Sequence, residues 1–190
     1  MVVNIRLRAW ASRQFYDPEP VLRHLRGVEI DLAQSDTPEL IRRLRTNRLK
    51  TDREARNALL FAHGMSSAVA GKVLVAPGEV EDCDFITKTQ VRDTEFFSCV
   101  QLKELAPEDL NPSHTLDALV TELSQLPKSD GVLAIHLNRR GQIQLSTLSA
   151  VRVPFAELWY FWAATPDMSA WRLYGDAMGQ PSLYEFQHPS

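Results

Sequence analysis

One segment of this chain, residues 96–137, restricts its fold more than any other. Phe96–Lys103 is an apolar, β-prone run of the kind that forms a strand buried on both faces. Leucine or valine then recurs at helical spacing, at positions 116, 119, 120, 123 and 126. Gly131–Leu137 follows as a second strand of the buried type. Because a strand, a helix and a strand form a right-handed crossover, the two strands are predicted to lie parallel in one sheet.

A helix and two shorter strands are expected before this segment. The spacing of alanine and leucine predicts a helix that starts near Thr51 or Asp52. Lys72–Ala76 and Asp84–Thr89 are typical of short strands. The second of them is expected to form an antiparallel hairpin with Phe96–Lys103. The predicted fold class is therefore α/β, with a mixed sheet flanked by helices.

The flanking regions give weaker patterns. Val2–Leu7 alternates as an edge strand does, and Val28–Leu32 could be a strand or a connector. Gln142–Leu148 is predicted to be a further strand. Pro154 is expected to open a helix that contains four consecutive aromatic residues, Trp159–Trp162. Four aromatics in a row cannot all face one side, so this helix would lie inside the core or at a subunit contact.

Length and composition indicate an ordinary soluble domain that spans residues 1–190. The chain is 44% hydrophobic and 24% charged, and it contains no apolar run near eighteen residues, so no membrane span is expected. Its N-terminus lacks the pattern of a secretory signal. The two cysteines, Cys83 and Cys99, suggest neither a metal-ligand cluster nor a disulfide framework. A cytoplasmic location is therefore the expectation.

Positive charge is concentrated near the N-terminus. Residues 1–60 hold 12 Lys or Arg against 8 Asp or Glu, and eleven of the twelve are arginines. Arginine-rich faces suit phosphate contact, although a solvated helix face is the simpler interpretation. The densest cluster, and the candidate for binding nucleic acid, consists of Arg42, Arg43, Arg45, Arg48 and Lys50.

Polar residues interrupt the strand at positions 96–103. Strand geometry places Gln101 and Lys103 on the same side. A lysine at the end of a buried strand needs a partner or a cavity, and Asp84 is the natural partner. Glu54, in the first turn of the helix expected from Thr51, is either a fourth member of this set or simply a favourable charge at the helix N-terminus.

This order of elements, with an Asp on the second strand and Gln-x-Lys on the third, resembles the PD-(D/E)XK nuclease superfamily and its restriction-endonuclease-like fold. The resemblance covers residues 51–148 and implies an αβββαβ core with a mixed sheet. Residues 1–50 would form a basic N-terminal extension and residues 149–190 an aromatic-rich C-terminal one, both of them helical additions to the core.

The resemblance implies a function and a set of site residues. The chain would be a metal-dependent endonuclease that hydrolyses phosphodiester bonds in DNA, and nucleases of this fold often act as homodimers. Asp84, Gln101 and the carbonyl of Leu102 would hold Mg²⁺ or Mn²⁺, because hard cations take oxygen ligands. Lys103 would orient the attacking water or stabilise negative charge, and Glu54 would assist.

The sequence departs from the family pattern in two places. Cys83 stands where the family name has proline, and Gln101 replaces the commoner carboxylate, which removes one negative charge from the proposed site. Asp82 shares strand parity with Asp84 and is an alternative ligand. These departures keep open a second interpretation, a catalytically degenerate nuclease fold that serves as a nucleic-acid- or protein-binding regulatory module.

Two further interpretations assign these residues no catalytic role. Lys103 could pair with Asp84 or Glu104 for purely structural reasons, with Gln101 a satisfied polar group in the core. Alternatively, the chain could be an unrelated α/β protein whose tryptophan-rich C-terminal helix forms a subunit interface. His136, alone in its strand, is expected to be a hydrogen-bonded structural residue.

Overall fold

A computed structural model describes residues 5–42, 45–69, 71–80, 83–139 and 143–190. The helices are α1 (Ile5–Ala11), α2 (Pro18–Ala33), α3 (Glu39–Arg42), the short 3₁₀ helix η1 (Asn47–Leu49), α4 (Lys50–Ala68), α5 (Leu116–Ser124) and α6 (Leu145–Ala150). The strands are β1 (Val73–Val80), β2 (Cys83–Val91), β3 (Thr94–Leu105), β4 (Val132–Leu137), β5 (Glu157–Ala163), β6 (Ala170–Gly175) and β7 (Ser182–Gln187). Within these ranges no helix is long and apolar enough to cross a lipid bilayer.

The seven strands form one mixed sheet in which they lie in chain order, β1 to β7. β2 is antiparallel to both β1 and β3, and β4 runs parallel to both β3 and β5. β6 and β7 complete the sheet with antiparallel pairings. The parallel pairing predicted for the strands on either side of α5 is therefore confirmed, and so is the antiparallel hairpin.

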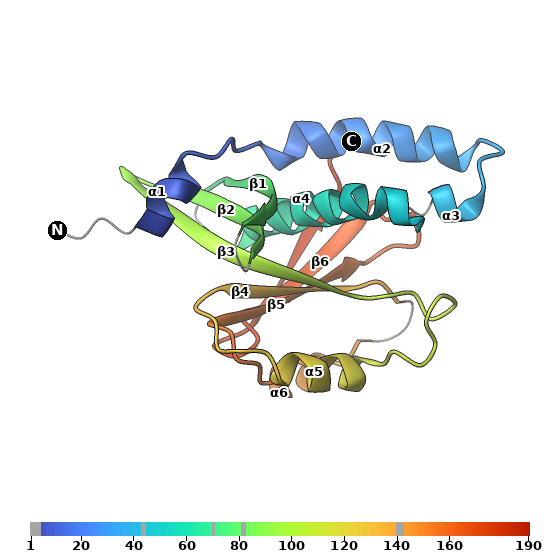
Figure 1. Cartoon of the computed structure of the whole chain (residues 1–190). Coiled ribbons are helices and arrows are strands. Elements are labelled where there is room, and N and C mark those ends of the chain that lie inside the picture. Colours follow the sequence, from blue (N-terminus) through green and yellow to red (C-terminus); the bar gives the residue numbers. More distant parts are fainter. Residues whose placement is uncertain (1–4, 43–44, 70, 81–82, 140–142) are drawn as a thin grey trace.

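Helices cover both sides of the sheet, which gives three layers (Figure 1). One side, which we call the α4 face, carries Phe85 and Val100 and packs against α4, where Phe61 contacts Phe85 edge-on. α2 packs against α4 in turn. Strands buried on both faces explain why β4 reads as a continuous apolar run.

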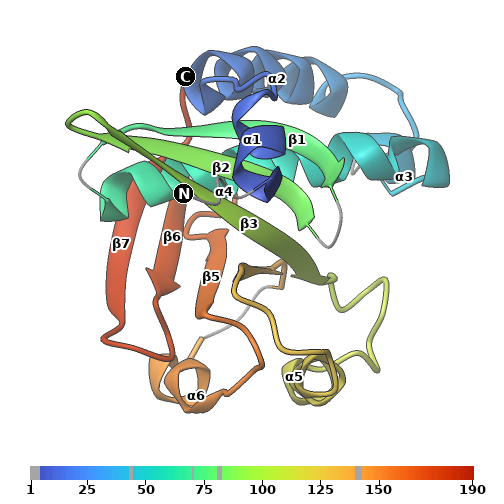
Figure 2. The same ribbon diagram turned by 60° about the vertical axis from the view of Figure 1, so that its left-hand side comes forward.

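The other side, which we call the α5 face, is covered by two separate groups of helices. Trp10 of α1 packs against Ile86 and Cys99 at one end. Leucines of α5 and α6 pack against Ile135 and Tyr160 at the other end. Figure 2 shows α1 in front of the β2–β3 pair and α5 and α6 at the opposite end of the sheet.

The aromatic segment Trp159–Trp162 lies in β5, so the predicted helix after Pro154 is wrong. Its side chains alternate between the two faces. Trp159 and Phe161 join the core beneath α4, and Tyr160 and Trp162 join the core beneath α5. A strand that is buried on both faces needs apolar side chains at every position, and an uninterrupted aromatic run meets this need. The C-terminal extension is thus three strands rather than the expected helical addition, and the sheet is larger than the predicted core.

Three shorter assignments also change. The predicted strand Gln142–Leu148, of which Gln142 lies outside the described ranges, is replaced by α6, in which Leu145 and Leu148 lie one turn apart and pack against the sheet. α1 takes the place of the edge strand expected over Val2–Leu7, of which residues 2–4 lie outside the described ranges. Val28–Leu32 belongs to the long helix α2, which Asp17 caps by accepting a hydrogen bond from the backbone N–H of Glu19.

Cys83 and Cys99 form a disulfide bond, contrary to the expectation from sequence. Both cysteines are buried, and their Cα atoms are 5.4 Å apart on the neighbouring strands β2 and β3. Gly131, at the start of β4, packs against this bridge. A Cβ atom at Gly131 would lie 2.9 Å from the carbonyl oxygen of Cys99, so a side chain there would displace β3.

Removing the disulfide should lower the free energy of unfolding by about 3 kcal/mol, because the bridge closes a loop of about 15 residues in the unfolded chain. The test is urea unfolding of the oxidised wild type and of a Cys83→Ala, Cys99→Ala variant. Equal free energies of unfolding for the two proteins would contradict this assignment.

Candidate functional site

Asp84 lies where β2 separates from β3. The last regular pair of the two strands joins Phe85 to Val100. Beyond this pair, the backbone N–H of Leu102 in β3 has a side-chain acceptor instead of a backbone carbonyl of β2. It donates a hydrogen bond of 2.6 Å to Oδ2 of Asp84. The contact places an acid beside the Gln-Leu-Lys sequence, but the backbone of Leu102 makes it. Among the described residues, the pairing of Asp84 with the Lys103 side chain that the sequence suggested is not formed.

Gln101 and Lys103 both lie on the α5 face. Their neighbours across the parallel ladder are Leu133 and Ile135, which belong to the core under α5. Both side chains are only partly buried, because this part of β3 lies between the region covered by α1 and the region covered by α5. In the described part of the chain, neither side chain makes a hydrogen bond or an ion pair.

This arrangement brings together oxygen donors and a cation. Asp84 has one carboxylate oxygen that is not bonded to Leu102, and the amide of Gln101 is unused by described residues. Such oxygens are the ligands that hard divalent cations take. Lys103 adds an ammonium group on the same strand face. The alternative ligand, Asp82, lies outside the described residues.

Glu54 is not brought to this group. It lies in the first helical turns of α4, half-exposed, where its carboxylate is 3.5 Å from the ammonium group of Lys50. The N-terminal part of α4 lies over the α4 face, since Arg53 contacts Glu104 of β3 there. The sheet itself therefore separates Glu54 from Gln101 and Lys103.

Two described members of the predicted nucleic-acid-binding cluster, Arg45 and Lys50, also lie on the α4 side. Arg45 does not face solvent. Its guanidinium forms two hydrogen bonds to Glu104, of 2.9 and 2.5 Å. Lys50 pairs with Glu54, and Arg48 is exposed. Arg43 and the side chain of Arg42 lie outside the described structure.

Glu104 is the centre of a polar cluster that the sequence analysis did not identify. It directly follows Lys103 and therefore points to the opposite face, where it meets Arg45, Arg53 and Asn138. Burial alone would raise the pKa of the Glu104 carboxyl, but the hydrogen bonds from Arg45 and Asn138 and the nearby positive charge bring it below its ordinary value. This carboxylate stays charged, and it fixes the segment before α4 to the sheet.

His136 lies beside Glu104 in the register of β3 and β4. Its ring stacks on Phe161 with centroids 4.8 Å apart, and its Nδ1 atom has no hydrogen-bond partner. Burial lowers the pKa of His136 to about 4, despite the Glu104 carboxylate 3.8 Å away. The imidazole is therefore neutral at pH 7, and the expected structural role agrees with its buried position, although not with the hydrogen bonding expected of it.

Comparison of the chain with family models, with curated proteins and with solved structures gives no match. The site is therefore interpreted from its own geometry.

Replacing Glu104 with alanine should lower the free energy of unfolding by roughly 3–5 kcal/mol, because it leaves the buried guanidinium of Arg45 without its partner. Glu185→Ala is the matched control. It breaks the exposed pair with Arg172, for which a loss below about 1 kcal/mol is expected. Urea unfolding of the two variants provides the comparison, and similar losses would refute a special role for Glu104.

The buried imidazole should make stability depend on pH. The pKa of His136 is lowered on folding, so the unfolded chain binds a proton that the folded chain does not. Stability is then complete above about pH 6.5 and falls by roughly 3 kcal/mol as the pH decreases to about 4. In His136→Phe the part due to this histidine should disappear. The remaining dependence comes from His188, whose pKa burial also lowers, and from the carboxyls of Glu29 and Glu104, whose pKa values their arginine partners lower. Urea unfolding at pH 4.5 and at pH 7 measures the difference in the free energy of unfolding between the two pH values. The same difference in the wild type and in His136→Phe would contradict the lowered pKa of His136.

Proposed function

We propose that this protein is a divalent-metal-dependent endonuclease with a restriction-endonuclease-like core, which hydrolyses phosphodiester bonds in DNA. The observation that carries the proposal is the contact between Asp84 and the backbone of the Gln101-Leu102-Lys103 segment. It joins the two parts of the motif, eighteen residues apart in sequence, on adjacent strands. The order α4, β1, β2, β3, α5, β4 agrees with the αβββαβ order that the resemblance requires.

The residues of this site fit a hard cation. The carboxylate of Asp84, the amide oxygen of Gln101 and the carbonyl of Leu102 would hold Mg²⁺ or Mn²⁺. When bound, the ion would neutralise charge on a phosphate and lower the pKa of a water molecule. Lys103 would hold that water or stabilise the negative charge that develops on the phosphate oxygens. The bond from the Leu102 N–H fixes the position of Asp84 for this role.

A second candidate function is a catalytically degenerate nuclease fold that binds nucleic acid or a protein. Two observations favour it. Glu54 lies across the sheet from Lys103, so a helix-borne acid does not join the site. One oxygen of Asp84 is already engaged by the backbone of Leu102. With Gln101 in place of a carboxylate, the site also holds less negative charge for a cation.

Location and assembly are further parts of this proposal. We propose a cytoplasmic protein that forms a homodimer, as nucleases that cut both strands often do. The disulfide between Cys83 and Cys99 counts against the cytoplasmic part of this proposal, because cytosolic thiols are generally kept reduced.

Cleavage of supercoiled plasmid and of single-stranded DNA with Mn²⁺ tests the first function. Lys103→Ala should reduce the rate at least 100-fold, on the order of the loss expected for one group that stabilises transition-state charge. Lys72→Ala, which breaks an exposed pair with Asp17, should cleave as the wild type does. Equal cleavage by the wild type and Lys103→Ala would remove Lys103 from the mechanism.

Thermal unfolding with and without Mn²⁺ separates the two functions. An active site predicts stabilisation of the wild type by the ion and none of Asp84→Ala, since only the folded site binds it. DNA binding without cleavage and without stabilisation by the ion would favour the degenerate module instead.

A further inference from the structure

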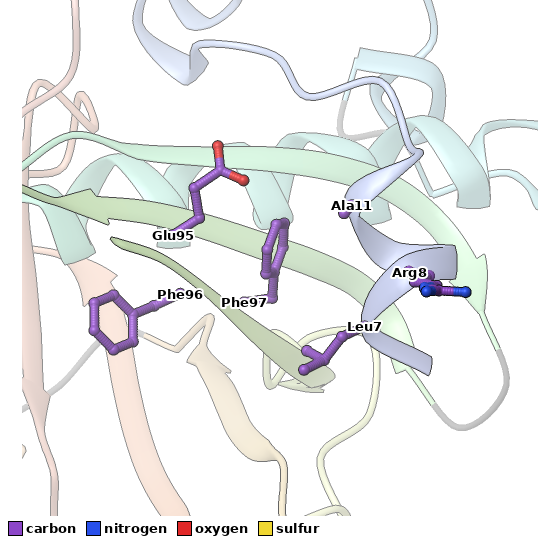
Figure 3. A pocket seen from close by; sticks show the side chains of 6 residues that line it. All are labelled: Leu7, Arg8, Ala11, Glu95, Phe96 and Phe97. Carbon is purple, nitrogen blue, oxygen red and sulfur yellow. The ribbon is translucent and has the colours of Figure 1, made fainter. Parts of the chain in front are cut away.

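The disulfide between Cys83 and Cys99 lies beside the candidate site. Cys83 directly precedes Asp84, and Cys99 lies on β3 just before the Gln-Leu-Lys segment. α1 lies against this face of β3 next to the bridge, where Phe97 is directed toward the helix and Phe96 away from it (Figure 3). We propose that the disulfide positions Asp84, so that the site takes a divalent cation only in the oxidised protein.

The bridge holds the start of β2 in a bend. The regular ladder pairs Ile86 with Cys99. In a straight strand Cys83 would lie three residues beyond that pair, and its Cα atom would be roughly 11 Å from that of Cys99. The observed separation is 5.4 Å, so β2 bends toward β3 after the last regular pair. Asp84 lies within this bend, and there its carboxylate meets the backbone N–H of Leu102.

Reduction would remove the covalent support of the bend. The thiolate of a dithiol reductant attacks the bridge and forms a mixed disulfide, and its second thiolate then displaces the remaining cysteine. Two electrons and two protons pass to the protein, which gains two thiols, and the dithiol leaves as a cyclic disulfide. The two cysteine sulfurs must then lie at contact distance instead of bonding distance.

The packing around the bridge determines which cysteine moves. Cys99 is held on one side by Gly131, where a Cβ atom would lie only 3.3 Å from its sulfur. It is also held by its strand, since β3 pairs with β4 from Val100 onward. Cys83 is therefore the residue that moves, and Asp84 moves with it, away from the N–H of Leu102.

This inference rests on the proposed function, because Asp84 is a ligand of the proposed metal site. Disulfides in cytosolic proteins are usually transient and either catalytic or redox-sensing. A bridge next to a metal ligand would make DNA cleavage depend on oxidising conditions. The site would then be without its carboxylate in a reducing compartment.

Amide hydrogen exchange in EDTA, followed by NMR, tests the positioning of Asp84 without metal or DNA. In the dithiol-reduced protein, and in Cys83→Ala, Cys99→Ala, the Leu102 amide should exchange about 10-fold to 100-fold faster than in the oxidised wild type. This is the change expected when a hydrogen bond to a charged group opens. The amide of Ile135, in the centre of the sheet, is the internal reference and should change less.

Leu22→Ala is the control for a general loss of stability. Leu22 is fully buried in α2, which packs on α4, and its truncation should destabilise the protein about as much as removal of the bridge does. With the disulfide intact, this variant should keep the ratio of Leu102 to Ile135 exchange that the wild type has.

Thermal unfolding with Mn²⁺ tests the consequence for the site. The ion should raise the Tm of the oxidised wild type and of oxidised Leu22→Ala. It should leave unchanged the Tm of the reduced wild type and of Cys83→Ala, Cys99→Ala, since neither holds Asp84 in place.

Three results would overturn the inference. They are a bridge that the dithiol does not reduce in the folded protein, an exchange rate of Leu102 relative to Ile135 that is the same with and without the bridge, and equal stabilisation of the oxidised and reduced proteins by Mn²⁺. Failure of the proposed function looks different. There, reduction accelerates the exchange of Leu102 as expected, but Mn²⁺ stabilises neither form.

Discussion

The position of β3 between two partners determines where every polar side chain near the site points. β3 pairs with β2 along its first half and with β4 along its second half, and helices cover both faces of the sheet. Side chains along the strand therefore alternate between two different environments. Lys103 lies partly buried on the α5 face, while Glu104, its neighbour, enters an ion-pair cluster beneath α4. Two adjacent charged residues thus serve separate purposes, and they cannot pair with each other as one interpretation of the sequence allowed.

The arginine content of the N-terminal third is explained in part by this packing. Arg45 and Arg53 surround Glu104, and Arg56 and Arg26 surround Glu29 of α2. Burial opposes the charge of Glu29, but Arg56 and Arg26 lower its pKa below the ordinary value. These arginines attach α2 and the segment before α4 to the sheet and to each other. An arginine-rich sequence is therefore not in itself a phosphate-binding surface, because ion pairing inside the fold uses the same donors.

The sequence was sufficient to predict the part of the fold governed by local pattern. The i, i+3, i+4 spacing of leucines predicted α5, and the apolar runs on either side predicted two parallel strands. The aromatic run at 159–162 was assigned to a helix because no local feature shows that a strand is covered on both faces. The disulfide and the Glu104 cluster could not be predicted for a similar reason. The disulfide and the Glu104 cluster both join residues that come close only because of the register between strands. For Cys83 and Cys99, the one indication in the sequence was that they lie on two strands predicted to pair.

The two faces of the sheet differ in what they leave available to a ligand. On the α4 face, the polar groups of Arg45, Glu104 and Asn138 bond to one another, which leaves little binding capacity for a phosphate. On the α5 face, Gln101, Lys103 and Arg8 have no partners among the described residues. These side chains are exposed or partly buried, so water satisfies them and a ligand can replace that water, which the bonded groups of the α4 face do not allow. The distribution of satisfied and unsatisfied groups therefore favours substrate binding on the α5 face. Under the proposed function, the substrate would therefore approach β3 from the α5 face rather than bind the arginines of residues 42–50.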